Sequence, residues 1–277
     1  MRETVELHPP FSEAWSETEA FAEVGKLSGE LFRRVRSRST FRIEFAGRGF
    51  FVKHHLGVGW LEILKNLSQF KLPVLGAENE RRAIAALEAA GVPTMTVAAF
   101  GRRKRPLDPA REESFLITEE IADAVNLEDF SKPWAADPPE FALRLAVTRS
   151  LADSASAMHR AGVNHRDCYL CHYLLPAGTP RDAAAVTLRV IDLHRAQIRA
   201  EVPRRYHVKD LAGLMFSAFD SGLTRNDALR FLRRYCRRPL REELAERRSF
   251  WRAVEAAARR LYFKEFRKEA PRLFRGL

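Results

Sequence analysis

The spacing of hydrophobic residues changes about halfway along the chain, from a period of two to the longer period of a helix. Apolar and polar residues alternate over 41–45, glycines follow at 47 and 49, and the alternation resumes over 51–53. This pattern predicts a β-hairpin. The apolar runs 97–103 and 114–121 predict two more strands on either side of a polar loop. The first half is therefore rich in strands.

One helix interrupts these strands. Residues 77–90 begin with acidic residues, place Ile84 and Leu87 on one face, and are followed by a glycine and a proline that are typical of a helix end. The preceding segment, 56–76, also has apolar residues at helical spacing. It can be a packed connector or an interaction surface, and its pattern does not decide between the two.

The second half has the period of helices. Further helices are predicted from Lys209 onward, one opened by the capping-box pair Thr224 and Asp227, and the last extending over about 240–270. The segment 141–162 carries one apolar stripe and ends in glycine; the stripe consists of Leu143, Val147, Leu151 and Met158.

Together these patterns predict an α+β fold with two lobes. We expect an irregular N-terminal arm over 1–39, a β-rich, nucleotide-binding lobe over 40–120 and a mostly helical lobe over 121–277. The hinge is expected at 119–126. A cleft between two such lobes is a natural site for a nucleotide.

Composition narrows the class of protein. The chain has 277 residues, 46% of them hydrophobic, which is enough for a packed core. No run reaches the roughly 20 apolar residues of a membrane-spanning helix, and the N-terminus lacks the features of a secretory signal. We therefore expect a soluble, cytoplasmic protein. The three cysteines make no disulfide framework.

The net charge predicts an anionic partner. Lys and Arg number 47 against 36 Asp and Glu, which gives +11. A glycolipid rich in phosphate, an anionic membrane surface and an acidic protein all fit, and so does a basic surface without a specific partner. The sequence has no recognisable nucleic-acid module, and its aromatic residues are not interleaved with the basic ones. Nucleic acid is therefore not expected.

The segment 164–175, NHRDCYLCHYLL, admits two interpretations. Its middle, CYLCH, has the spacing of a c-type haem attachment site. Its start, HRD, which ends at Asp167, has the wording of a kinase catalytic loop. Haem of this type is attached outside the cytoplasm, and nothing in the sequence directs the chain there. The kinase interpretation is therefore preferred.

Phosphoryl transfer needs a cation on the phosphates, a carboxylate for metal and a carboxylate that receives the proton of the attacking hydroxyl. Lys53, on a predicted strand, can supply the cation, with Glu80 in the next helix as its counter-charge. Asp167 can receive the proton. Asp192 ends the short apolar strand at 190–191, where a carboxylate needs a cation. Each residue alone has an ordinary structural explanation, and their order along the chain supports the kinase interpretation.

Five segments in this order, FFVK, the helix with Glu80, FLITEE, HRDCYLCHYLL and VIDLHRA, closely resemble the lipopolysaccharide core heptose kinases, the WaaP (RfaP) family of Gram-negative bacteria. The resemblance covers about 40–240 and implies a protein-kinase-like fold. It also implies ATP-dependent phosphorylation of the inner-core heptose I at its 4-hydroxyl, with Mg²⁺, by an enzyme at the cytoplasmic face of the inner membrane.

The resemblance also implies roles for individual residues. Lys53 would bind the α- and β-phosphates of ATP and Glu80 would orient Lys53. Asp167 would be the catalytic base, Asp192 would hold magnesium, and main-chain groups from Glu119 to Ile121 would meet the adenine.

Two features depart from the general kinase pattern. No G-x-G-x-x-G precedes Lys53, and only the segment 46–49 can form a phosphate-covering turn, with Arg48 as a phosphate contact. His172 stands where protein kinases place a metal-binding Asn. It can be a metal ligand, or it can hydrogen-bond Asp167.

Acceptor contacts are predicted just past Asp192, at His194, Arg195 and Arg199, with His54 and His55 as further candidates. The catalytic residues leave other acceptors open, such as Kdo, an aminoglycoside or a protein side chain. A non-catalytic scaffold that binds glycolipid or an acidic protein is the remaining alternative. Association with the inner membrane is expected to be peripheral, through basic patches and the segment 56–75.

Overall fold

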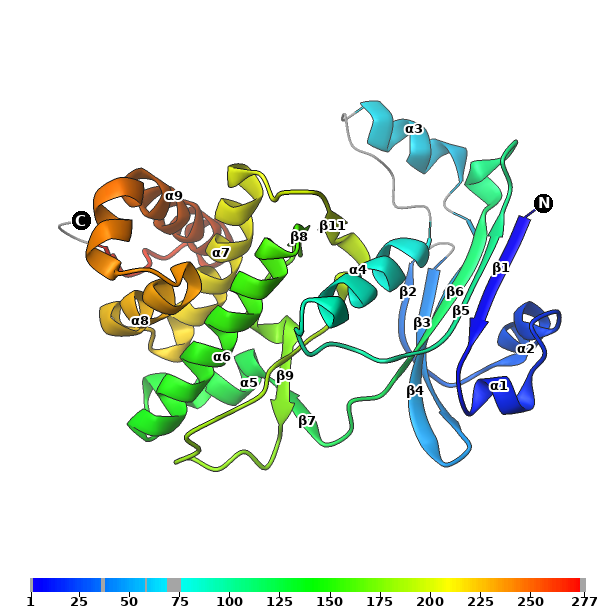
Figure 1. Cartoon of the computed structure of the whole chain (residues 1–277), viewed down its shortest axis with the longest axis horizontal. Helices are drawn as coiled ribbons and strands as arrows, with labels where there is room; N and C mark the ends of the chain where they lie inside the picture. The colour runs from blue at the N-terminus through cyan, green and yellow to red at the C-terminus, as the bar shows by residue number, and fades with distance from the viewer. Residues whose placement is uncertain (1, 36–37, 58, 69–75, 275–277) are drawn as a thin grey trace. The chain divides into compact units, whose positions relative to one another are not determined.

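The computed structural model describes residues 2–35, 38–57, 59–68 and 76–274. The chain divides into two compact units. One unit holds Met1–Ala85 and Met95–Ala122, and the other holds Ala86–Thr94 and Asp123–Leu277. Figure 1 labels the elements of both.

The first unit is built on a six-stranded antiparallel sheet in the order β1-β5-β6-β4-β3-β2. The predicted hairpin and the two later strands form its centre. β1 and β2, which the hydrophobic pattern did not predict, form its two edges. The strands are β1 (Arg2–Leu7), β2 (Glu30–Val35), β3 (Arg38–Phe45), β4 (Arg48–His55), β5 (Val97–Lys104) and β6 (Glu113–Glu119).

An aromatic core holds two short helices, α1 (Phe11–Ala14) and α2 (Ala20–Lys26), against this sheet (Figure 1). The fully buried Phe11 stacks on Phe45 and meets Phe50 edge to face. Burial of such a side chain contributes about 1.5–3 kcal/mol. The segment predicted to be an irregular arm therefore adds strands and helices to the unit.

Two more helices follow β4. The helical spacing of 56–76 is confirmed by α3 (Trp60–Ser68), although the predicted break at Pro73 lies outside the described residues. The predicted helix near 77–90 is confirmed by α4 (Glu78–Ala89). Gly91 follows it with φ of 68°, a left-handed conformation that ends a helix without strain in glycine.

The second unit is mostly helical. The predicted apolar stripe of α6 is buried, and the predicted capping box opens α8, where Thr224 and Asp227 exchange hydrogen bonds. The helices are α5 (Leu127–Ser131), α6 (Phe141–Arg160), α7 (Arg204–Ala218), α8 (Arg225–Cys236) and α9 (Leu240–Phe266).

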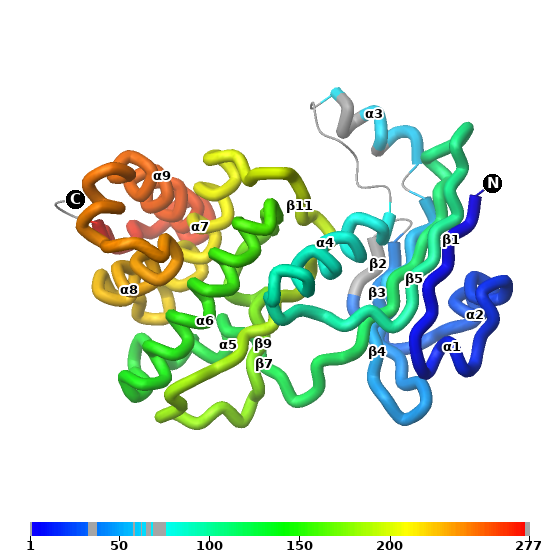
Figure 2. The backbone as a smooth tube through the Cα atoms, viewed as in Figure 1, coloured from blue at the N-terminus to red at the C-terminus, as the bar shows by residue number. Residues whose placement is uncertain are grey.

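Short strands hold the loops of this unit. β7 (Ala124–Asn126), β9 (Tyr173–Pro176) and β10 (Arg189–Val190) form one small sheet, and β8 (Val163–Asn164) pairs with β11 (Gln197–Ile198). Figure 2 traces the backbone from α6 through β9 to β11. The antiparallel sheet and the helical unit confirm the α+β class. Among the described residues, no helix has the length and apolar character that crossing a membrane requires.

Candidate active site

A buried ion pair links β4 to α4 in the first unit. Lys53 Nζ lies 2.6 Å from Glu80 Oε1, and the two residues are only 8% and 1% exposed. Charges removed from water need such a partner. The register of β4 places Lys53 between Thr40 of β3 and Leu116 of β6, in the middle of the sheet. The two predicted phosphate-site residues are therefore in contact.

The predicted phosphate-covering turn joins β3 and β4. Ala46 and Gly47 have φ of 50° and 72°, as a two-residue hairpin turn requires. Arg48 donates to Glu119 Oε1 at 2.6 Å. A side chain at Gly49 would place its Cβ 1.8 Å from Glu120 Oε2. Gly49 thus makes room for a carboxylate of the same unit.

That carboxylate is held firmly. Glu120 accepts two hydrogen bonds from the Arg42 guanidinium, at 2.8 and 2.7 Å, and its amide donates to the Gly49 carbonyl at 2.9 Å. The pairing with Arg42 lowers the pKa of Glu120. The Glu119 amide donates to the Thr96 carbonyl, and Ile121 is partly exposed. His54 pairs with Glu113 at 3.1 Å.

In the second unit, a buried carboxylate fixes the backbone before Asp167. Asp210 of α7, which is fully buried, accepts hydrogen bonds from the amides of His165 at 2.6 Å and Arg166 at 2.9 Å. Arg166 has φ of 74°, a conformation that is uncommon outside glycine. The two hydrogen bonds that Asp210 accepts from consecutive amides position the loop that carries Asp167.

Sequence reasoning missed Asp210. Its only signal is a carboxylate between apolar residues of a helix, in the run KDLAGLM. A solvated helix face gives the same pattern, so the role of this residue emerges only from the contact between α7 and the loop.

Two imidazoles of the segment 164–175 stack on each other. His165 and His172 are nearly parallel with centroids 5.4 Å apart. His165 donates through Nε2 to the Ile191 carbonyl at 3.0 Å, and burial lowers its pKa. His172 donates through Nδ1 to the Asp167 carbonyl at 2.7 Å. A His172 ring in the tautomer with its proton on Nδ1 carries its lone pair on Nε2.

Asp192 stands next to that lone pair. His172 Nε2 lies 3.6 Å from Asp192 Oδ2, and His194 Nδ1 lies 2.7 Å from Asp192 Oδ1. Asp192 has φ of 58° and ψ of 54°, a left-handed conformation, just before a short 3₁₀ turn, Leu193–Arg195. The predicted metal-site residues Asp192 and His172 are thus brought together, with His194 as a third neighbour.

These groups fit a magnesium ion that arrives with a nucleotide. Within the part of the chain that the structure describes, no cluster of three or more His, Cys, Asp or Glu residues is arranged to hold a metal alone. Mg²⁺ commonly uses one or two carboxylates together with substrate phosphates and water. Asp192 can supply such a carboxylate.

Two arginines predicted to contact the acceptor are engaged differently. Arg195 Nη1 lies 2.8 Å from both Oδ1 and Oδ2 of Asp167. Arg199 donates to Asn164 and Gln197, each at 2.7 Å, and stacks on Tyr206. Arg195 therefore touches the candidate base, whereas Arg199 ties β8 to β11.

The two cysteines of the CYLCH segment lie in surroundings that favour the protonated thiol. Cys168 is buried, its thiol lies 3.2 Å from the Tyr173 hydroxyl, and burial raises its pKa well above the ordinary value. Burial also raises the pKa of Cys171, to about 12. Both thiols therefore favour the protonated form, and the role of this segment as a catalytic loop stays a prediction.

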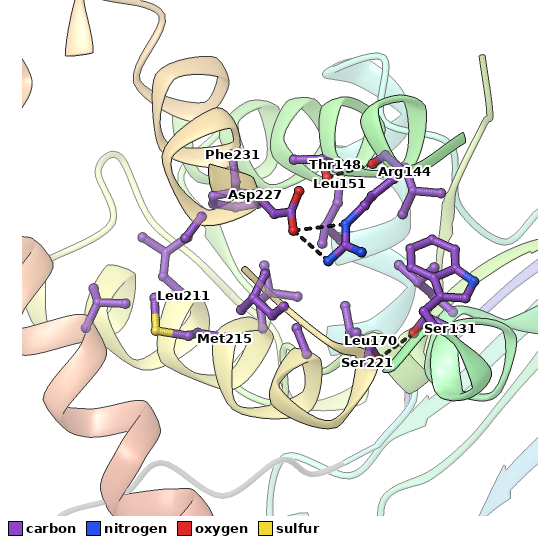
Figure 3. A pocket seen from close by; sticks show the side chains of 18 of the residues that line it. Ser131, Arg144, Thr148, Leu151, Leu170, Leu211, Met215, Ser221, Asp227 and Phe231 are labelled. Carbon is purple, nitrogen blue, oxygen red and sulfur yellow. Dashed lines mark hydrogen bonds and ion pairs between the residues drawn. The ribbon is translucent and has the colours of Figure 1, made fainter. Parts of the chain in front are cut away.

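A separate, mostly apolar pocket opens among the helices of the second unit (Figure 3). An ion pair between Arg144 and Asp227 and a hydrogen bond between Ser131 and Ser221 lie at its wall. Neither Asp167 nor Asp192 lines it. Its apolar lining includes Leu127, Val147, Leu151, Leu170, Leu211, Leu214, Met215, Ala228, Phe231, Trp251, Val254 and Phe274.

Comparisons with known proteins agree with this geometry. Residues 22–235 match the model of the lipopolysaccharide kinase (Kdo/WaaP) family. The lipopolysaccharide core heptose(I) kinase WaaP of Pseudomonas aeruginosa is 50% identical over 261 residues, which cover 94% of this chain and 97% of that protein. The WaaP heptose(I) kinase of Escherichia coli K12 is 42% identical, over 95% and 99% of the two chains.

A solved structure extends the likeness to three dimensions. WaaP in complex with acyl carrier protein is 46% identical and superposes with a TM-score of 0.81, over 94% of this chain and 99% of that one. The sequence resemblance and the kinase-like fold it implied are confirmed by these matches.

Proposed function

The chain belongs to the lipopolysaccharide kinase (Kdo/WaaP) family, and we propose that it transfers phosphate from ATP to heptose I of the lipopolysaccharide inner core, at the 4-hydroxyl. It is a kinase, so ATP is its expected phosphate donor. The observation that carries the proposal is the Asp167 loop, with its backbone held by Asp210 and the Asp192 carboxylate beside the His172 lone pair.

Asp167 orients the acceptor hydroxyl and receives its proton as the oxygen attacks the γ-phosphate. The fixed amides of His165 and Arg166 support this role, because a base must be held in place to accept a proton at a defined position. His172 adds a hydrogen bond to the Asp167 carbonyl and tightens the same loop.

Lys53 binds the α- and β-phosphates, and Glu80 keeps its ammonium oriented. The buried 2.6 Å pair supports this assignment, since a lysine without a partner would be costly to bury there. Main-chain groups from Glu119 to Ile121 meet the adenine.

Asp192 would hold magnesium, with His172 Nε2 as the predicted second ligand, and His194 donates a hydrogen bond that orients the Asp192 carboxylate. The metal, when bound, neutralises charge on the phosphates. The His194 hydrogen bond leaves Oδ2 of Asp192 directed toward His172, which favours this division of roles.

The test is transfer from γ-labelled ATP, with magnesium, to lipopolysaccharide that lacks heptose phosphate. We expect Asp167→Ala to lower the rate about 10²- to 10⁴-fold, and Asp182→Ala, an exposed loop carboxylate, to leave it unchanged. Mass spectrometry and NMR of the product identify the hydroxyl. Transfer that persists in Asp167→Ala would refute the mechanism. Transfer to Kdo, an aminoglycoside or protein in preference to heptose would favour the alternative acceptors.

We also infer an acidic protein partner, acyl carrier protein. The support is the related complex, the net charge of +11 and the apolar pocket of Figure 3, which suits an acyl chain. Calorimetry should detect binding of acylated carrier protein that weakens with salt. Filling the pocket by Ala228→Phe should abolish the preference for the acylated over the unacylated form. If Ala228→Phe unfolds at the wild-type temperature and still prefers the acylated carrier protein, the pocket is not the site that binds the acyl chain.

Peripheral association with the inner membrane is the last part of the proposal. Trp60, Leu61 and Leu64 of α3 are exposed, which supports an apolar contact with the membrane. Flotation with anionic vesicles should decrease at high salt and with Leu61→Asp. Binding that is insensitive to both would contradict it.

A further inference from the structure

The candidate base is occupied in this structure. A single nitrogen of Arg195 lies 2.8 Å from both carboxylate oxygens of Asp167. An acceptor hydroxyl needs one of these oxygens to receive its proton. Each oxygen keeps a second lone pair, so Arg195 does not block the carboxylate, but its hydrogen bonds compete with the hydroxyl for the same negative charge.

Arg195 is built so that its head group can move. Its side chain is 43% exposed, at the end of the short 3₁₀ turn. The flanking Leu193 and Ala196 are buried and hold the backbone there. Rotation of the long side chain changes only the ion pair, because the turn stays anchored.

Two further cations lie beside this pair. Arg166 precedes Asp167, and Lys209 precedes Asp210, whose carboxylate is committed to the loop amides. Lys209 interacts electrostatically with Asp167, Arg166 and Arg195, and burial is the largest cause of its lowered pKa. Burial, and next the neighbouring Arg195, lower the pKa of Arg166.

The balance of charge at this position is positive. Within the described residues, the side-chain cations of Arg166 and Lys209 make no hydrogen bond or ion pair. Two carboxylates, Asp167 and the buried Asp210, act on Lys209, so two negative charges face three cations at the loop. A phosphate or carboxylate brought here would be attracted by all three, and an arginine fork binds such groups with two hydrogen bonds.

We propose that Arg166, Arg195 and Lys209 form a subsite for an anionic substituent of the acceptor, and that Arg195 moves from Asp167 to this anion when the acceptor binds. The competing hydrogen bonds of Arg195 are then removed from the base only when the correct, negatively charged acceptor is present. This inference rests on the proposed function, because it specifies which sugar acceptors Asp167 serves. The anion is a phosphate ester or a sugar carboxylate.

The test uses the delipidated core oligosaccharide without phosphate on heptose I as acceptor, in three forms: otherwise intact, with its remaining phosphate esters removed, and with carboxyl groups reduced to alcohols. For the wild type, we expect KM to rise at least about tenfold for the form that lacks the recognised anion, which identifies the anion. Lys209→Met should raise KM for the intact form about tenfold. For this variant, KM should not rise further when the acceptor lacks the recognised anion. Lys264→Met, on the exposed side of α9, is the matched control.

Arg195→Met should change the rate of phosphorylation in opposite directions for the anion-free acceptor and the intact acceptor. Without its anion, the wild-type arginine stays on Asp167, so the variant should phosphorylate the anion-free acceptor faster than wild type and the intact one more slowly. Arg233→Met controls for loss of a surface arginine. A general structural defect would slow both reactions.

Equal KM values for all three acceptors with the wild type would overturn the subsite. A rise in KM for ATP alone in Lys209→Met or Arg195→Met would assign these cations to the nucleotide and would also overturn it. Failure of the wild type to phosphorylate any form, while ATP still binds, would instead refute the proposed function.

Discussion

Asp210 is the clearest case of one residue that determines the position of another. Its carboxylate replaces water for two consecutive amides, and it also meets His159 Nε2 at 3.3 Å. These contacts hold the loop without touching the reacting atoms. Asp210 is therefore a positioning residue rather than a catalytic one.

Removal of this carboxylate should affect both stability and rate. In Asp210→Ala, two buried amides lose their acceptor at about 1–3 kcal/mol each. We expect the free energy of unfolding to fall by about 3 kcal/mol and kcat to fall more than the KM for ATP rises. Urea denaturation and steady-state kinetics measure these. Asp220→Ala, an exposed carboxylate bonded to Tyr262, is the control. Unchanged kcat in a folded Asp210→Ala would contradict the positioning role.

The Lys53–Glu80 pair allows a quantitative test. Either single change, Lys53→Met or Glu80→Gln, leaves one buried group without its partner and should cost about 3–5 kcal/mol of stability. The double variant should cost less than the sum of the two, because no charge is then left alone. Urea denaturation of the four proteins gives the coupling energy. Additive losses would mean that the contact at 2.6 Å contributes nothing.

Sequence reasoning nominated Lys53, Glu80, Asp167 and Asp192 because each lies at a recognisable point of strand, helix or motif. It left open what His172 does, since a tautomer depends on contacts in space. In the structure, His172 Nδ1 donates a hydrogen bond to the Asp167 carbonyl. Metal ligation by His172 stays a prediction.

At the scale of elements, the β3–β4 turn contains two glycines, and each position favours glycine for a different physical reason. Gly47 needs a left-handed conformation and has open space around its Cα. Gly49 needs the absence of a Cβ, because the Glu120 carboxylate occupies that space.

This difference gives a prediction. Gly49→Ala should displace Glu120 from Arg42, lower the free energy of unfolding by about 1–3 kcal/mol and raise the KM for ATP, since the turn adjoins the strand of Lys53. Gly47→Asn should be nearly neutral, because Asn tolerates a left-handed turn. Thermal unfolding and ATP kinetics distinguish them. Equal losses in both variants would refute the role of Glu120.

Sequence patterns predicted neither the strands β1 and β2 nor the short helices α1, α2 and α5. For the two strands, the reason is their place in the sheet. Both are edge strands, and β1 (RETVEL) carries charged residues along a largely exposed face. Edge strands avoid the apolar alternation that identifies central ones because it would invite aggregation. The helices α6 and α8 were predictable because their stripe and cap are local features.

At the scale of the whole molecule, charge alone could not choose a partner. A net charge of +11 fits a glycolipid, a membrane or an acidic protein equally well. Motifs dispersed over most of the chain, and a relative that matches over 94% of it, supplied the reaction class. The domain boundaries at 40 and 121 stay a prediction, which limited proteolysis would test.

The pH dependence of stability follows from two histidines that fold in the neutral form. Burial lowers the pKa of His207 from 6.5 to about 4, helped by His159, stacked on it at 4.7 Å, and by Arg247, while Asp210 acts in the opposite direction. Burial likewise lowers the pKa of His165. The unfolded chain therefore binds more protons than the folded one below about pH 6.5.

Stability should accordingly be constant above that pH and fall as pH decreases toward 4. Because His207 is only partly buried, solvent screening limits its share to about 1 kcal/mol. Urea denaturation at pH 7 and pH 5 should show a smaller loss in His207→Phe than in wild type, with the remainder carried by His165. His8→Gln, near the surface, should keep the wild-type loss. An equal loss in His207→Phe would show that other groups cause the acid sensitivity.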